Sequence, residues 1–146
     1  AQYRVGEQIA PACHTQCHRV TRTSDGQELA AKILVSNEPS AFESFEHELN
    51  VWESLSHPHI MPLLAVSRDN LGAIMPWCEL GNLQQWLKGH GRVDEVQAMS
   101  WLRQLASALA YLHERGISHG DVKLDNIILQ SQDHLLLSDF GLSECQ

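Results

Sequence analysis

The sequence lacks any long uninterrupted apolar segment. None of its 146 residues falls in a run of about 18 uncharged apolar residues, so the sequence predicts no membrane-spanning helix. Its first ten residues, AQYRVGEQIA, contain neither a basic region nor an apolar core and predict no signal peptide. We therefore expect no membrane among the partners of this chain.

Positive charge and cysteine are also scarce. The chain has 10 Lys and Arg against 18 Asp and Glu, a formal net charge of -8 at pH 7, and its basic residues form no cluster. Proteins bind nucleic-acid backbones mainly through such clusters, so we expect no nucleic-acid binding. Cys13, Cys17, Cys78 and Cys145 are too few for a dense disulfide framework. They predict a reducing, cytoplasmic location.

Apolar material, by contrast, is sufficient for a packed core. The residues are 43% hydrophobic and 19% charged, which is typical of a globular protein, and 146 residues amount to one domain or part of one. The first half predicts extended segments around one helix. These are an extended region at 3–35 with a turn at Asp25-Gly26, a helix at 40–55 with Ser40 as N-cap, and a hairpin of 60–66 and 71–78 turning at 68–70.

The second half predicts helices followed by short strands and loops. A short helix at 83–87 precedes a glycine-rich turn at 89–91, and a long helix from about 94 to 114 ends before Gly116. Residues 117–145 contain short strands and loops rich in Asp, Lys and Asn. Strands first and helices late indicate an α+β fold.

Two polar motifs in this late region stand at a fixed separation. The first is HGDVKLDN, residues 119–126, and the second is DFG, residues 139–141, which begins thirteen residues after Asn126. Here the sequence resembles the eukaryotic-type protein kinase family, which has the catalytic loop H-R-D-x-K-x-x-N and a metal-binding DFG at these places. DFG alone would be weak evidence, but the pair behind a long amphipathic helix is specific.

The resemblance implies ATP-dependent phosphoryl transfer to Ser or Thr hydroxyls of proteins. Asp121 would accept the hydroxyl proton, and Lys123, which is typical of the Ser/Thr class, would contact the γ-phosphate. Asn126 and Asp139 would bind Mg²⁺, which prefers oxygen ligands. Taken singly, Asp121 and Asn126 are also consistent with loop caps; the agreement of seven positions favours a kinase.

Further upstream positions also match the family. Lys32 in Ala-Ala-Lys corresponds to the lysine that holds the α- and β-phosphates, and Glu48, sixteen residues later, to its glutamate partner. Taken singly, this lysine and glutamate are equally consistent with solvated charges. Met75 corresponds to the gatekeeper, and the backbone at Pro76 and Cys78 to the hinge that binds adenine; proline keeps the carbonyl needed there. Further cofactor contacts are implied for Ile9, Cys17, Ala30 and Ile128.

The implied architecture is a protein-kinase-like α+β fold. It comprises an antiparallel five-stranded small lobe with one helix at about 1–75, a hinge at 76–82, and the first part of a mainly helical large lobe at 83–146. We expect this partial domain to leave apolar residues of the long helix exposed and so to favour a partner protein that covers them. These residues are Trp101, Leu102, Leu105 and Leu109.

The chain departs from the family in two motifs. The family's glycine-rich phosphate loop aligns with IAPACHTQCH, residues 9–18, where Ala10, Ala12 and Thr15 replace the three glycines. Pro11 also removes a backbone donor, so we expect a stiffer loop that approaches phosphate less closely. Gly120 replaces the arginine of H-R-D, so activation through a phosphorylated loop is not expected.

Two alternative functions follow from these departures. One is a pseudokinase or truncated kinase-like module that acts as a scaffold or regulator. The other is a metal site at Cys13, Cys17 and His18, suggested by two cysteines and two histidines within six residues. The C-x3-C-H spacing is one residue longer than the usual haem attachment motif, and no matching cysteine pair follows downstream.

Overall fold

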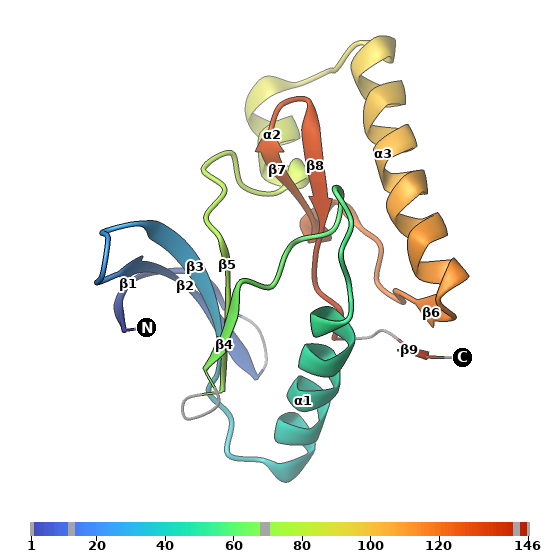
Figure 1. The fold of residues 1–146 in the computed structure, drawn as a ribbon. Helices are drawn as coiled ribbons and strands as arrows, with labels where there is room; N and C mark the ends of the chain where they lie inside the picture. Colours follow the sequence, from blue (N-terminus) through green and yellow to red (C-terminus); the bar gives the residue numbers. More distant parts are fainter. Residues whose placement is uncertain (1, 12–13, 68–70, 142–143, 146) are drawn as a thin grey trace. The chain divides into compact units, whose positions relative to one another are not determined.

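The computed structural model describes residues 2–11, 14–67, 71–141 and 144–145. The chain forms two compact units, which are described separately below and are both drawn in Figure 1. The first unit contains residues 1–53 and 62–77, and the second contains residues 54–61 and 78–146. The turn predicted at 68–70 lies outside the described residues.

The first unit contains a five-stranded antiparallel sheet, as predicted. Its strand order is β1-β2-β3-β5-β4. The strands are β1 (Tyr3–Pro11), β2 (Thr15–Arg22), β3 (Glu28–Leu34), β4 (Ala65–Ser67) and β5 (Gly72–Pro76). The predicted turn joins β2 and β3, with Gly26 at a φ of 71°. The second predicted hairpin is also present, although its first strand begins at 65 instead of 60.

Side-chain alternation divides this sheet into two chemically different faces. Leu29 and Ala31 of β3 are buried with Val20 and Ile74 in one apolar cluster. Because successive strand residues point to opposite faces, Ala30 and Lys32 lie on the other face of the sheet. The core therefore occupies one face, and the opposite face presents Lys32.

The helix α1 (Pro39–Glu53) begins one residue earlier than predicted. Ser40 is not its N-cap, because Pro39 already lies in the first turn, where its fixed φ is suitable and its missing N–H costs nothing. The Glu38 carbonyl accepts hydrogen bonds from the next turn. Most of the apolar positions that predicted the helix are buried, but Phe42 is 42% exposed.

The second unit contains two helices and short strand pairs. Its elements are α2 (Leu83–His90), α3 (Glu95–Glu114), β6 (Ile117–Ser118), a 3-10 helix (Leu124–Asn126), β7 (Ile127–Ser131), β8 (His134–Leu137) and β9 (Glu144–Cys145). β7 pairs with β8, and β6 pairs with β9. Asp94 is the N-cap of α3, because its Oδ1 accepts a hydrogen bond from the Gln97 amide at 2.8 Å. This agrees with the predicted start of the helix. The turn predicted at 89–91 is shorter, because Gly89 still belongs to α2.

Trp101 on α3 is buried, which contradicts the prediction that it would be exposed. Its Nε1 donates a hydrogen bond to the Gln132 carbonyl at 2.8 Å, and its ring meets Trp86 of α2 edge-on at a centroid distance of 5.5 Å. The turn between β7 and β8 therefore covers this part of the helix. Leu102 is 59% exposed, as predicted, whereas the two leucines that follow it in the predicted patch, Leu105 and Leu109, are half-buried.

Residues 54–61 follow α1 in the chain but pack within the second unit. The Leu137 amide donates to the His59 carbonyl at 2.8 Å, and the Met61 amide donates to the Leu137 carbonyl at 2.9 Å. His57 Nε2 lies 3.1 Å from Ser107 Oγ of α3. Burial, with smaller contributions from His59 and Arg115, lowers the pKa of His57 below 6.5.

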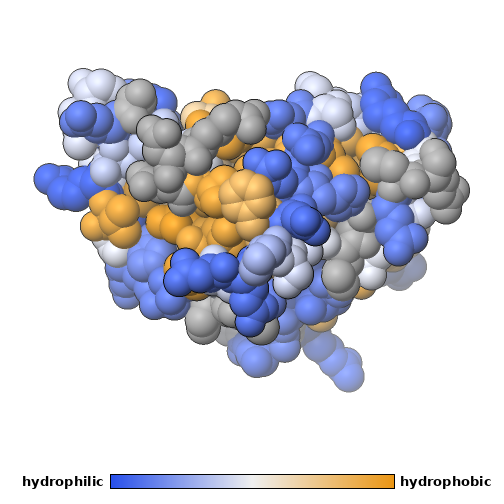
Figure 2. Space-filling view, turned by 90° about the horizontal axis from the view of Figure 1, so that it is seen from below, coloured by the Kyte–Doolittle hydropathy of each residue, from blue (hydrophilic) through white to orange (hydrophobic). Residues whose placement is uncertain are grey.

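The surface is mainly polar. Large apolar side chains are exposed at scattered positions such as Val5, Phe42 and Val96, and the face in Figure 2 shows apolar residues gathered near its middle among hydrophilic ones. Within the part of the chain that the structure describes, no helix has both the length and the apolar character needed to cross a membrane.

Candidate active site

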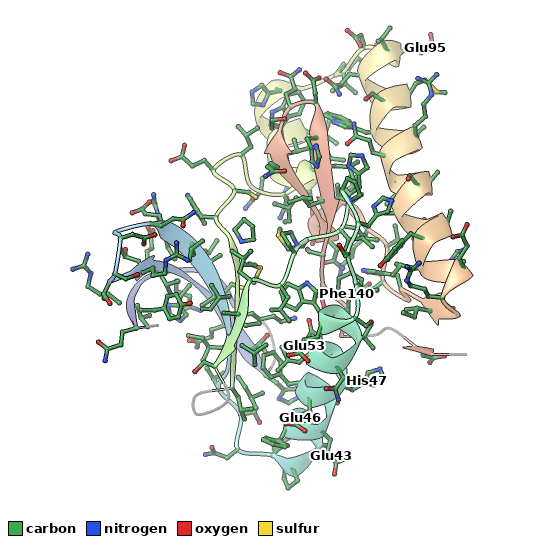
Figure 3. All side chains as sticks on the ribbon, viewed as in Figure 1. Glu43, Glu46, His47, Glu53, Glu95 and Phe140 are labelled. Atoms are coloured by element: carbon green, nitrogen blue, oxygen red, sulfur yellow. The ribbon has the colours of Figure 1, made fainter. Side chains whose placement is uncertain are left out.

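The Lys32 ammonium forms a buried ion pair with the Glu48 carboxylate. Lys32 Nζ of β3 lies 2.6 Å from Glu48 Oε2 of α1, and their side chains are only 13% and 5% exposed. Figure 3 shows other acidic residues, Glu43, Glu46 and Glu53, along the same helix. The pair predicted from a sixteen-residue offset is thus formed. Since isolated buried charges are unfavourable, each charge of this pair compensates the other.

Three of the residues predicted to contact adenine from the first unit, Cys17, Ala30 and Met75, share the face of Lys32. Cys17 lies directly opposite Lys32, and Ala30 lies directly opposite Met75. Directly opposed residues on neighbouring strands point to the same side, so these four side chains form one surface. Ile9 on β1 is 41% exposed.

The two hinge positions predicted to bind adenine follow from the end of β5. Pro76 is the last residue of that strand and lies opposite Leu29. Cys78 is 8% exposed, and burial raises the pKa of its thiol. The Cys78 carbonyl accepts a hydrogen bond from the Gly81 amide at 3.1 Å and keeps a second lone pair for a ligand.

Ile128, the remaining residue predicted to contact adenine, lies on β7 in the second unit. It forms an isolated antiparallel bridge with Asn82, the N-cap of α2. The amide of the next residue, Leu129, donates to the Gly81 carbonyl at 3.0 Å. These backbone contacts hold Ile128 beside the start of α2. Gly81 and Asn82, which make the contacts, follow Cys78 by three and four residues.

The three predicted residues of the catalytic loop are brought together. Asn126 Nδ2 donates to the Asp121 carbonyl at 2.8 Å and to Asp121 Oδ2 at 3.0 Å. Lys123 Nζ lies 3.6 Å from the same carboxylate oxygen. Asn126 is buried, whereas the Asp121 side chain remains 27% exposed. Because Asn126 donates through nitrogen, its amide oxygen is the atom suited to bind a cation.

His119 connects this loop to the DFG segment. The ring is 2% exposed, and its Nδ1 accepts a hydrogen bond from the Asp121 amide at 3.1 Å. The proton therefore sits on Nε2, which donates to the Ser138 carbonyl at 2.9 Å. The ring also meets Phe140 edge-on at 5.2 Å. His119 thus links the Asp121 amide to the Ser138 carbonyl, a partner that the sequence did not single out.

Asp139 has a backbone conformation that is rare for a residue with a side chain. Its φ is 64°, and its Oδ1 accepts a hydrogen bond from the Gly141 amide at 3.2 Å. The Ser138 amide before it donates to the Asn126 carbonyl at 2.8 Å. Such strain persists only where surrounding contacts enforce it and is concentrated at functional sites. The two predicted metal ligands, Asn126 and Asp139, are therefore linked through Ser138.

Gly120, the departure from H-R-D, adopts a conformation that favours glycine. Its φ is 85°. We expect Gly120→Ala to lower the free energy of unfolding by about 1–2 kcal/mol, because an L-residue is strained there. Gly89→Ala is the matched control: it lies within α2 with no atom within 4 Å of an added Cβ, so we expect a gain of about 0.5–1 kcal/mol. Urea unfolding measures both; equal effects would contradict the role of φ.

The segment aligned with the phosphate loop is described in part. Ala12 and Cys13 lie outside the described residues, while Thr15 and Cys17 belong to β2. His18 Nδ1 lies 3.3 Å from the Gly6 carbonyl, and its Nε2 lies 3.1 Å from Gln16 Oε1. Among the residues that the structure describes, no three His, Cys, Asp or Glu side chains form a group that could hold a metal ion.

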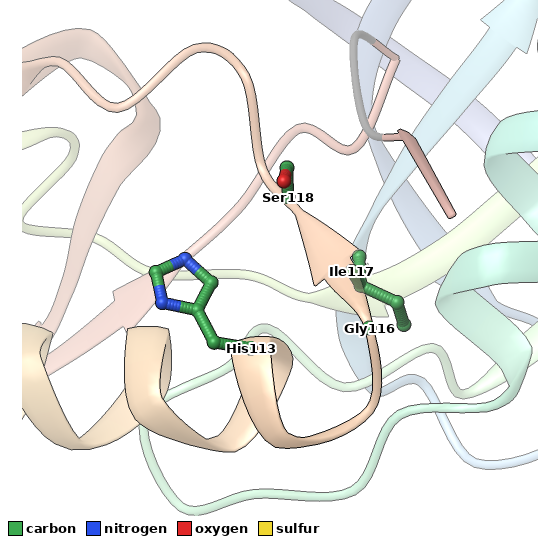
Figure 4. A pocket seen from close by; sticks show the side chains of 4 residues that line it. All are labelled: His113, Gly116, Ile117 and Ser118. Atoms are coloured by element: carbon green, nitrogen blue, oxygen red, sulfur yellow. The ribbon is translucent and has the colours of Figure 1, made fainter. Parts of the chain in front are cut away.

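A pocket of about 250 Å³ lies at the end of α3 in the second unit. Figure 4 shows its lining by His113, Gly116, Ile117 and Ser118. None of the residues predicted to bind ATP or Mg²⁺ lines this pocket. It is therefore separate from the residues assembled above.

Comparisons with known proteins identify the family. The family model of the protein kinase domain matches residues 3–146. Serine/threonine-protein kinase cds1 of Schizosaccharomyces pombe is 35% identical over 114 residues, covering 77% of this chain and 25% of its own length. NUAK family SNF1-like kinase 1 of Homo sapiens is 29% identical over 147 residues, covering 97% of this chain and 22% of its own length. This chain thus spans about a quarter of these relatives, and it belongs to the protein kinase family.

Proposed function

We propose that this chain binds MgATP and contributes to transfer of the γ-phosphoryl group to Ser or Thr hydroxyls of a protein substrate. The observation that carries the proposal is the set of Asp121, Lys123 and Asn126, in which Asn126 donates hydrogen bonds to Asp121 and Lys123 forms an ion pair with it. It combines a partly exposed carboxylate, a cation and an amide oxygen within one short loop. The relatives named above are Ser/Thr protein kinases or kinases by name, which supports the same chemistry.

The residues of the first unit suit binding of the nucleotide. The Lys32 ammonium would attract the α- and β-phosphates, and Glu48 would hold the ammonium in place through their 2.6 Å contact. Ile9, Cys17, Ala30 and Met75 would supply apolar contacts to adenine, together with Ile128 of the second unit. The carbonyl of Pro76 and, in the second unit, the carbonyl and amide of Cys78 would bind the polar edge of the base.

The residues of the second unit suit Mg²⁺ and proton transfer. The carboxylate of Asp139 and the amide oxygen of Asn126 are oxygen donors of the kind that Mg²⁺ prefers. When bound, the ion would neutralise charge on the phosphate oxygens. Asp121 would take the proton from the substrate hydroxyl. At the same time the hydroxyl oxygen would form a bond to the γ-phosphorus, and ADP would leave. Lys123 would offset charge on the γ-phosphate.

A second candidate function is a kinase-like scaffold that does not turn over ATP. The glycine-free loop favours it, because Thr15 and the alanines restrict close backbone contact with phosphate. The exposed apolar residues on α3, Val96 and Leu102, offer a surface for a partner protein. The cytoplasmic location and the division into lobes at about 1–75 and 83–146 remain predictions that accompany both functions.

Thermal unfolding with and without MgATP distinguishes these functions. At a ligand concentration of about 100 Kd, binding adds about 2.7 kcal/mol and raises the melting temperature by several degrees. We expect this rise to disappear in Lys32→Ala and Asp139→Asn but to persist in Lys88→Ala, which alters an exposed lysine of α2. For each variant, the melting temperature with MgATP is compared with that of the same variant without MgATP. This is needed because Lys32→Ala also removes the partner of buried Glu48 and so alters stability by itself. No rise in the unaltered chain would contradict the proposal and favour the scaffold.

A further inference from the structure

A cluster of three residues lies beyond the predicted adenine contacts of the first unit. The Arg19 guanidinium on β2 stands over the Trp77 ring, with Cζ 4.8 Å from the ring centroid. The same guanidinium is ion-paired with the Glu28 carboxylate of β3. None of these residues belongs to the catalytic machinery described above. The cluster therefore has a role other than catalysis.

The register of the sheet places this cluster next to the adenine contacts. Arg19 lies directly opposite Ala30, which in turn lies opposite Met75. Trp77 follows Met75 by two residues and stands between Pro76 and Cys78, whose backbone is proposed to bind adenine. The Arg19 side chain thus extends from β2, past β3, to the middle residue of the hinge. It connects the sheet to the segment that must be ordered for base recognition.

The contacts of the cluster indicate that Arg19 and Trp77 interact through the face of the indole ring. The Trp77 Nε1 and Arg19 Nε atoms are both buried, and neither has a hydrogen-bond partner within the part of the chain that the structure describes. A guanidinium held over an indole ring needs neither of these atoms, since the attraction acts through the ring face. Glu28 supplies the orientation: its ion pair is partly exposed and by itself adds little stability.

We propose that Arg19 is a positioning residue for the hinge and raises affinity for the adenine base of ATP. Stacked on Trp77 and oriented by Glu28, it holds the backbone from Pro76 to Cys78 in the geometry that binds the base. This inference rests on the proposed function, because it assumes that the hinge binds ATP. Binding to a segment that is already ordered avoids the entropic cost of ordering it.

Nucleotide titrations of matched variants test this role. Arg19→Leu is expected to raise the Kd for MgATP about 3- to 10-fold, the range for loss of one cation–π contact. Its Kd for magnesium tripolyphosphate, which has no base, is expected to stay unchanged. Trp77→Phe keeps an aromatic face and should remain within about twofold of the unaltered chain. Arg22→Leu is the control, because Arg22 lies on the same strand but pairs with Asp25 at 2.6 Å.

Two results would overturn the inference. One is an unchanged Kd for MgATP in Arg19→Leu; the other is an equal loss for ATP and tripolyphosphate, which indicates a general structural role. Hydrogen exchange of the Trp77 and Cys78 amides in the absence of nucleotide gives a second readout. We expect faster exchange in Arg19→Leu and in Glu28→Gln but not in Arg22→Leu. If the unaltered chain does not bind MgATP, the proposed function fails, and the exchange rates still decide whether Arg19 orders the hinge.

Discussion

Replacing Phe140 by alanine is expected to lower the free energy of unfolding by about 3–5 kcal/mol, the range for a large aromatic side chain removed from a packed interior. Phe140 is 0% exposed and meets the ring of His119 edge-on. The substitution therefore leaves a cavity and removes a contact that orients His119. Because His119 bonds both the Asp121 amide and the Ser138 carbonyl, the catalytic loop should lose order as well.

Phe42→Ala is the matched control for this substitution. Phe42 has the same side chain but is 42% exposed on α1, so we expect a loss below about 1 kcal/mol. Urea unfolding followed by tryptophan fluorescence measures both variants, since Trp52 lies in the first unit with Phe42, and Trp86 and Trp101 lie in the second unit with Phe140. Equal losses in the two variants would contradict the view that Phe140 of DFG fills a buried site against His119 of the catalytic loop.

Replacing Asp121 by asparagine is expected to reduce phosphoryl transfer to a Ser/Thr peptide mixture by about 10²- to 10⁴-fold. The amide cannot accept the hydroxyl proton, although it keeps nearly the same shape. Affinity for MgATP should change little, because Asp121 is not among the proposed nucleotide or metal ligands. The measurement is transfer of radiolabelled phosphate, with the Kd for MgATP determined on the same preparations.

Asp125→Asn provides the control for the loss of one carboxylate from the same loop. Asp125 is exposed in the 3-10 helix that follows Lys123, and we expect its substitution to leave transfer unchanged. If Asp121→Asn retained the activity of Asp125→Asn, the proposed role of Asp121 as proton acceptor would be wrong. If the unaltered chain shows no transfer but binds MgATP, the scaffold function is favoured.

Features set by local sequence were predicted well. The extended region at 3–35 with its turn at Asp25-Gly26 predicted β2 and β3, and Asp94 and Gly116 correctly bounded α3. The pairing of Lys32 with Glu48 followed from family spacing, which encodes the distance between β3 and α1. These predictions succeeded because each depends on residues that are close in sequence or on a pattern fixed within the family.

Features set by distant contacts were not predictable in the same way. Trp101 looked exposed because its partner, the Gln132 carbonyl, lies 31 residues away in the turn between β7 and β8. The packing of 54–61 in the second unit depends on backbone bonds to Leu137. The stack of Arg19 on Trp77 joins β2 to the residue that follows β5, far away in the sequence. No periodicity or motif encodes such contacts; they arise only when the strands and helices are assembled.

The most direct test of the central claim is a nuclear magnetic resonance titration with MnATP. Manganese accepts the same oxygen ligands as magnesium and broadens signals of nearby nuclei. We expect MnATP to broaden the amide signals of Asn126 and Asp139 most strongly and also to affect Lys32, and we expect Asp139→Asn to abolish this pattern. Broadening confined to His14–His18, with Lys32, Asn126 and Asp139 unaffected, would contradict the claim.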